Sequence, residues 1–89
     1  MNDLPKIDLT TFILSISSAA YMGLGIVPPP GAKEPRLDLD QARQNIDLLE
    51  LIYDKTRGNR TADEDKLIEQ LLFETRLKFV EKQKESRKK

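Results

Sequence analysis

The side chains that could do chemistry in this chain are mainly carboxylates, because its 89 residues include no histidine and no cysteine. The common general bases, thiol nucleophiles and zinc ligands are therefore missing. One set of acids shares a face of a predicted helix at spacings i, i+3 and i+7: Asp47, Glu50 and Asp54. Basic residues flank this set on the same helix, so we expect a solvated charged face rather than a magnesium site.

A second set of acids is consecutive and runs from Asp63 to Asp65. Adjacent helix residues point in different directions and cannot converge on one ion, whereas acids in a first helical turn favour helix formation. The serines at positions 15, 17 and 18 have no base partner, and Gly23-Leu24-Gly25 lacks the length and the lysine of a phosphate loop. The sequence predicts no enzyme, no cofactor and no metal site.

Composition limits the class of protein. Fifteen basic and fifteen acidic residues cancel, which gives no overall attraction to nucleic acid. A single domain of this length buries only about 60–65% of the surface of its unfolded chain, and without cysteine it cannot form a disulfide. Oligomerisation is the means of stabilisation that is left. The start of the chain has no basic region typical of a signal peptide, so a cytoplasmic location is assigned by default.

The elements that must position any site are helices, and we expect an all-α fold. Helix 1 is predicted at about 9–24 after an N-terminal tail (1–8), helix 2 at about 39–57 and helix 3 at about 62–82. A linker over 25–37 is rich in proline and glycine, which excludes a helix there. Residues 9–82 form a single helical domain in this interpretation, and the basic tail at 83–89 is expected to fray.

Capping residues mark the ends of helices 2 and 3. Asp38 is the predicted N-cap of helix 2, with Gln41 three residues later as in a capping box. Gly58 is expected at the C′ position with a positive φ. Thr61 and Glu64 form a second capping box that starts helix 3. The short connection predicts that helices 2 and 3 form an antiparallel hairpin.

Residues 9–32 contain no charged residue, although 34% of the chain is charged. Asp8 or Thr10 can cap helix 1. The larger side chains gather on one side of the helix, and a row of small ones lies opposite: Leu9, Phe12, Ile13, Ile16, Ala19 and Ala20 against Thr11, Ser15 and Ser18. A surface helix normally carries charge on its outer face. We therefore expect burial on both sides, by the hairpin and by a partner chain.

Two other interpretations of this uncharged segment stay open. A monomer can tolerate a serine- and threonine-rich surface. A membrane helix needs roughly 20 apolar residues, and this segment comes close in length. Its five hydroxyl side chains, its glycines and its flanks without a positive bias argue against a membrane partner.

Helix 3 carries more apolar residues than one hairpin can cover. One face is predicted to pack on helix 2: Leu67, Ile68, Leu71, Leu72, Thr75 and Phe79. A second stripe at i, i+4 and i+7 consists of Phe73, Leu77 and Val80. Helix 1, a second subunit or an unknown protein partner must cover this stripe, and we favour a symmetric dimer. The expected oligomer or partner interface comprises Phe12, Ser15, Ile16, Ser18, Ala19, Phe73, Leu77 and Val80.

The basic C-terminal residues suggest a nucleic-acid or anionic-membrane contact as a competing hypothesis. Six basic residues outnumber two acids between Lys78 and Lys89. The last ten residues include no aromatic side chain on which a base could stack. We therefore expect a solubilising terminus.

Two segments of the sequence resemble a family of small bacterial proteins defined only as a domain of unknown function: "TFILSISSAAYMGLGIVP" and "LDLDQARQNIDLLELIYDKTRGNRT". The resemblance covers Leu9 to Val80 and is most specific from Asp38 to Thr61. Arg60 stands where the family pattern has leucine, and Ser17, Ser18 and Ala19 are smaller than usual. The resemblance implies a bacterial source and a helical fold, and it implies no activity, cofactor or catalytic residue.

The function that these observations favour is that of a non-enzymatic, small helical homo-oligomer acting as a protein–protein interaction module. One alternative is a weak RNA binder that acts through the basic C-terminal tail. The other is a membrane-attached protein that inserts helix 1.

Overall fold

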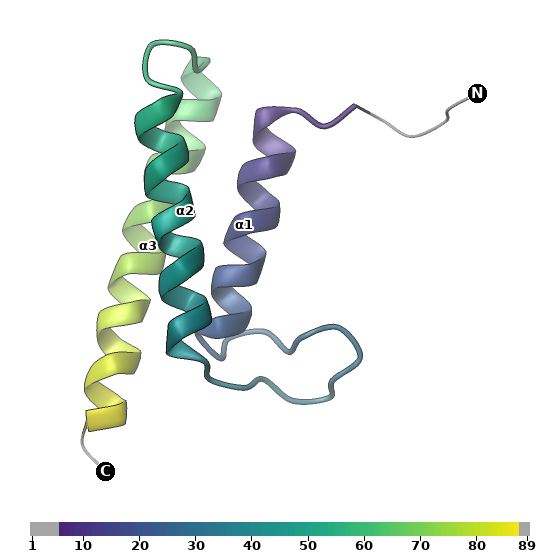
Figure 1. Cartoon of the computed structure of the whole chain (residues 1–89), viewed down its shortest axis with the longest axis vertical. Coiled ribbons are helices and arrows are strands. Elements are labelled where there is room, and N and C mark those ends of the chain that lie inside the picture. The colour runs from purple at the N-terminus through teal and green to yellow at the C-terminus, as the bar shows by residue number, and fades with distance from the viewer. Residues whose placement is uncertain (1–5, 88–89) are drawn as a thin grey trace.

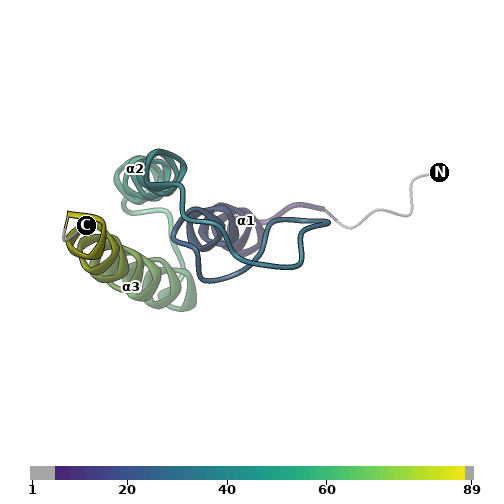
Figure 2. The same cartoon turned by 90° about the horizontal axis from the view of Figure 1, so that it is seen from below.

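A computed structural model describes residues 6–87 of the chain, which form three α-helices: α1 (Leu9–Gly23), α2 (Leu39–Lys55) and α3 (Ala62–Arg87). Helices α2 and α3 lie side by side as a hairpin, and α1 packs mainly on α2 (Figures 1 and 2). The predicted all-α fold with a hairpin of the second and third helices is confirmed. The parts of the predicted tails at residues 1–5 and 88–89 lie outside the described residues.

Helix α1 begins after Asp8, whose carboxylate accepts a hydrogen bond from the Thr11 backbone N–H at 2.8 Å. Asp8 rather than Thr10 is therefore the N-cap. The helix ends at Gly23, and Gly25 follows it with a φ of 74°. Helix α2 ends at Lys55, two residues earlier than expected.

The start of α2 shows one correct and one incorrect prediction. The Asp38 carboxylate accepts from the Gln41 backbone N–H at 3.1 Å, which confirms Asp38 as the N-cap. The reciprocal bond of a capping box is absent, because the Asp38 N–H donates to the Gly23 carbonyl at 2.7 Å. The Gln41 side chain instead donates to the Ala19 carbonyl at 3.3 Å. The predicted cap thus joins α1 to α2.

The turn between α2 and α3 follows the sequence prediction closely. Gly58 has a φ of 82°, which confirms its left-handed conformation, although it lies two residues after the C-cap Thr56 rather than at C′. The Glu64 N–H donates to the Thr61 hydroxyl at 3.1 Å, and the Thr61 N–H donates to the Glu64 carboxylate at 2.8 Å. This second capping box is confirmed.

Helix α3 extends to Arg87, five residues beyond its predicted end, so the expected frayed tail is helical over 83–87. Apolar residues are absent from this last segment, but good helix formers are frequent in it. Two ion pairs at spacing i,i+3 also stabilise the helix end, Lys78–Glu81 and Lys82–Glu85.

The core lies where the three helices meet and consists of Ile13, Ile16, Leu49, Ile68 and Leu72. The buried face of α1 is rotated from the predicted one. Ser17 is buried, and its hydroxyl donates to the Ile13 carbonyl at 2.7 Å, whereas Phe12, predicted on the same side of the helix as Ile13 and Ile16, is exposed. Because this hydrogen bond satisfies the hydroxyl, a serine can occupy the core at little cost.

The backbones of α1 and α2 come very close at Gly23. A Cβ atom at this position would lie 2.6 Å from the Ala42 backbone nitrogen, so only glycine fits. The loop over residues 24–37 begins beside this contact and is closed by an antiparallel bridge between Leu24 and Leu37. Within the loop, the Ala32 N–H donates to the Pro29 carbonyl at 3.0 Å. None of the described helices combines the length and the apolar character that crossing a membrane requires.

Candidate interaction surface

The outer side of α3 carries three exposed apolar side chains, which we call the α3 stripe: Phe73, Leu77 and Val80. Their exposed fractions are 66%, 48% and 45%. The opposite side of the helix is buried through Ile68, Leu72 and Thr75. Helix α1 of the same chain therefore leaves the stripe uncovered. The possibility that helix 1 covers it is wrong, and a second subunit and a protein partner remain as the other two possibilities.

An open groove of about 480 Å³ runs beside the α3 stripe, between α2 and α3. Its lining is mostly apolar and consists of Tyr53, Glu69, Leu72, Phe73, Arg76, Leu77 and Val80. A second groove of about 340 Å³ shares Arg76 and Val80 with it. Arg76 donates to Glu50 of α2 through Nε at 3.0 Å, and one of its terminal nitrogens lies 2.9 Å from the same carboxylate oxygen. This ion pair lies where the grooves meet.

The outer face of α1 is a second surface without charge. Phe12, Ser15 and Ser18 are exposed on it, as predicted for the interface. Ala19 is half-buried, and its carbonyl accepts from Gln41. Ile16 lies in the core of its own chain and is therefore not available to a partner. Six of the eight predicted interface residues are thus exposed.

The described residues expose more large apolar side chains than sequence periodicity identified. Eleven are exposed, whereas nine apolar residues are buried. Leu14 on α1 and both Leu48 and Leu51 on α2 were missed. These three leucines could have been found as apolar residues that lie outside the main apolar face of their helix. A search for one apolar face per helix overlooks such residues.

Four of the six acidic residues weighed as possible metal ligands are bound to other groups of the chain. Glu50 pairs with Arg76, Asp54 with Arg57 at 3.0 Å, and Asp65 with Arg60. Glu64 belongs to the cap of α3. Within residues 6–87, no three acidic, histidine or cysteine side chains gather into a possible metal site.

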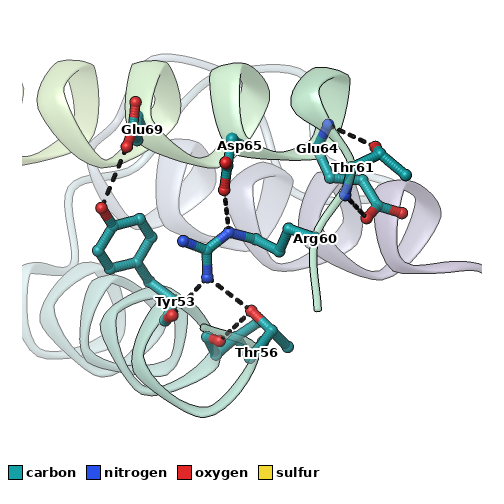
Figure 3. A network of polar contacts seen from close by, with 8 residues as sticks. Tyr53, Thr56, Arg60, Thr61, Glu64, Asp65 and Glu69 are labelled. Atoms are coloured by element: carbon teal, nitrogen blue, oxygen red, sulfur yellow. Dashed lines mark hydrogen bonds and ion pairs between the residues drawn. The ribbon is translucent and has the colours of Figure 1, made fainter. Parts of the chain in front are cut away.

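Arg60 ties the turn together, and Figure 3 shows its contacts. Its side chain is only 7% exposed and pairs with Asp65. It donates to the Tyr53 backbone carbonyl and, at 2.9 Å, to the Thr56 hydroxyl, and its guanidinium lies 4.3 Å from the centre of the Tyr53 ring. The Tyr53 hydroxyl donates in turn to Glu69 at 3.1 Å. Polar bonds thus hold Arg60 in the turn and join α2 to the start of α3.

Tyr21 joins α1 to α3 in a similar way. Its hydroxyl donates to Glu74 at 3.0 Å, and Gln70 donates to the other Glu74 oxygen at 3.2 Å. Burial, the hydrogen bond and the negative charge of Glu74 raise the pKa of Tyr21 to about 12. The pair holds α1 and α3 together.

Comparison with known proteins adds a family and nothing further. No curated protein and no solved structure matches the chain. The sequence model of one protein family, described as Domain of unknown function (DUF1844), matches residues 6–81. That match covers most of the chain, including all of α1 and α2 and the α3 stripe, and the chain therefore belongs to the DUF1844 family.

Proposed function

We propose that this protein is a non-enzymatic interaction module: a small helical homo-oligomer, a dimer by preference, that also contacts a protein partner. The observation that carries this proposal is the balance of exposed and buried side chains. Eleven large apolar side chains are exposed among the described residues, and three of them form the continuous α3 stripe. Contiguous apolar rows of this kind are characteristic of protein interaction sites.

The magnitude of the hydrophobic effect supports a contact that is useful but modest. Fully burying one large apolar side chain contributes about 1.5–3 kcal/mol, and the stripe side chains are already about half-buried. A symmetric dimer would cover three stripe side chains from each of two chains, which contributes about 5–9 kcal/mol. Association costs about 4–15 kcal/mol, so the grooves and charged rims beside the stripe must add to the contact.

The uncharged face of α1 provides the second surface. Phe12 and Leu14 are exposed at its edges, with Ser15 and Ser18 between them. A charged partner surface would lose hydration against this face without gaining an ion pair. It therefore suits an uncharged surface of the protein partner or of a further subunit.

Sedimentation equilibrium of the purified full chain tests the proposal. We expect a mass above that of the 10.2 kDa monomer. Leu77→Glu should lower this mass, because it places a charge in the covered stripe, and it should leave helicity unchanged, because Leu77 is half-exposed within its own chain. Gln44→Glu is the matched control, since it adds the same charge at an exposed site on α2.

The outcomes separate clearly. Loss of mass in Leu77→Glu with retained circular dichroism, and an unchanged mass in Gln44→Glu, supports the proposal. A monomeric natural chain, or a Leu77→Glu protein with the mass of the natural chain, contradicts it.

A further inference from the structure

The outward residues of α3 are arranged symmetrically about a point between Arg76 and Leu77. At 100° per residue, the side that carries the stripe includes five pairs of positions that are equally far from this midpoint: Lys66, Glu69, Gln70, Phe73, Arg76, Leu77, Val80, Gln83, Lys84 and Arg87. Phe73 and Val80 are equally far from the midpoint. The same holds for Glu69 with Lys84 and for Gln70 with Gln83. Each such pair would meet in two antiparallel copies of α3 related by a two-fold axis.

We propose that the partner covering the α3 stripe is the α3 stripe of a second copy, packed antiparallel with Glu69 of each chain opposite Lys84 of the other. This inference rests on the proposed homo-oligomer and specifies its contact. Phe73 of one chain then packs on Val80 of the other, and the two symmetry-related grooves face each other. The two Glu69–Lys84 ion pairs lie on either side of the apolar contact. Charged and polar groups are usual at the rim of a protein interface.

Both charged groups are available for this contact. Glu69 accepts one hydrogen bond, from the Tyr53 hydroxyl at 3.1 Å. Within the described part of the chain, Lys84 takes part in no ion pair. Arg76 lies near the two-fold axis, where two like charges would repel, but each guanidinium is bound to Glu50 of its own chain. That internal pair neutralises the centre of the interface.

The antiparallel arrangement is favoured over a parallel one by charge. Parallel copies would place Glu69 against Glu69 and Lys84 against Lys84, and the dipoles of the two helices would also align unfavourably. The antiparallel arrangement has one mismatch, Lys66 opposite Arg87. Both residues are exposed and lie at the ends of the contact, where salt screens repulsion effectively.

A charge-reversal cycle tests the pairing, with the dimer dissociation constant of the full chain measured by sedimentation at low salt. Glu69→Lys and Lys84→Glu should each weaken the dimer about 10-fold, because each variant converts two attractive pairs into repulsive ones. The double variant should return to within about 3-fold of the natural chain, because it restores both pairs with reversed sign. Glu34→Lys is the control for Glu69→Lys: it makes the same charge change at an exposed site in the loop between α1 and α2, outside the contact, and should leave the dimer intact.

Circular dichroism should show that each variant is folded, because both charged side chains are exposed. If the natural chain dimerises but the single reversals leave the dissociation constant unchanged, or the double variant fails to recover, the antiparallel α3 contact is overturned and the proposed homo-oligomer stands on another surface. If the natural chain is monomeric at its highest soluble concentration, this contact and the homo-oligomer both fail.

Discussion

The turn between α2 and α3 and the α3 stripe belong to the same helical hairpin, yet they satisfy their side chains in opposite ways. In the turn, the nearly buried Arg60 finds all its partners within the chain (Figure 3). Over the described residues, no buried side-chain nitrogen or oxygen atom lacks a hydrogen bond. On the stripe, Phe73, Leu77 and Val80 stay exposed. The turn thus contributes to the stability of the single chain, whereas the stripe contributes only when another surface covers it.

The largest loss of stability is expected for a variant that disrupts the turn between α2 and α3. Arg60→Ala removes three hydrogen bonds from a charged donor and the contact with the Tyr53 ring, so we expect the free energy of unfolding to fall by about 2–3 kcal/mol. For a domain of this size, the midpoint of thermal unfolding should drop by about 10–20 °C. Thermal and urea unfolding followed by circular dichroism measure the change.

Arg57→Ala is the matched control, because Arg57 also pairs with an acid in this region but is 72% exposed. Its effect should stay within about 0.5 kcal/mol. Equal stability losses in the two variants would remove the distinction between a turn that stabilises the chain and an exposed surface that does not.

A smaller effect tests the backbone of the same turn. Gly58→Val places a β-branched residue at a φ of 82°, which should cost about 1–2 kcal/mol. No atom lies within 4 Å of the added Cβ, so the cost is conformational rather than steric. The cost of Gly58→Asn should be only a few tenths of the cost of Gly58→Val, because asparagine tolerates this conformation. The mass in solution should not change in either variant; a Gly58→Val protein as stable as Gly58→Asn would show that the turn does not depend on this φ.

The smallest effect concerns a polar contact outside the turn, between Tyr21 and Glu74. The folded chain raises the pKa of Tyr21 from 10.0 to about 12, so the unfolded chain loses this proton first as pH rises. The stability contributed by the Tyr21 hydroxyl is therefore present below pH 10 and is lost as pH rises toward 12. Urea unfolding should show the natural chain more stable than Tyr21→Phe at neutral pH, with the difference shrinking above pH 10.

In a Glu74→Gln background this pH dependence should weaken, because the negative charge that opposes ionisation of Tyr21 is gone. A stability difference between the natural chain and Tyr21→Phe that stays constant across the alkaline range would show that the contact is electrostatically inert.

The sequence predicted the local features of the fold and missed those that depend on distant segments. Asp38, Gly58 and the Thr61–Glu64 box were found because a cap involves residues only three positions apart. The bond from Gln41 to Ala19 was missed, because it exists only after α1 has packed on α2. The close approach at Gly23 has the same origin, since nothing in its own helix reveals the Ala42 backbone beside it.

The candidate surface was predicted in part for the same reason. The α3 stripe was visible because its members share one helix at regular spacing, and a second face on one helix is a local property. The predicted apolar side of α1 does turn inward through Ile13, Ile16 and Ala20. The burial of Ser17 beside them was not visible, because its hydroxyl is satisfied by a hydrogen bond to its own helix that periodicity does not count. The grooves beside the stripe need two helices and therefore follow only from the structure.

The closed base of the loop between α1 and α2 has a practical consequence. The Leu24–Leu37 bridge and the bond from Asp38 to Gly23 hold the two ends of this loop together, and an added side chain at Gly31 would meet no atom within 4 Å. The entropy of closing a loop rises slowly with its length, by about 0.6 kcal/mol for each doubling. Because Gly31 has a φ of 81°, a substitution there would strain the backbone. A peptide epitope inserted after Gly31, which keeps this glycine, should therefore be tolerated, and it would label the protein without altering the exposed residues of α1 or α3.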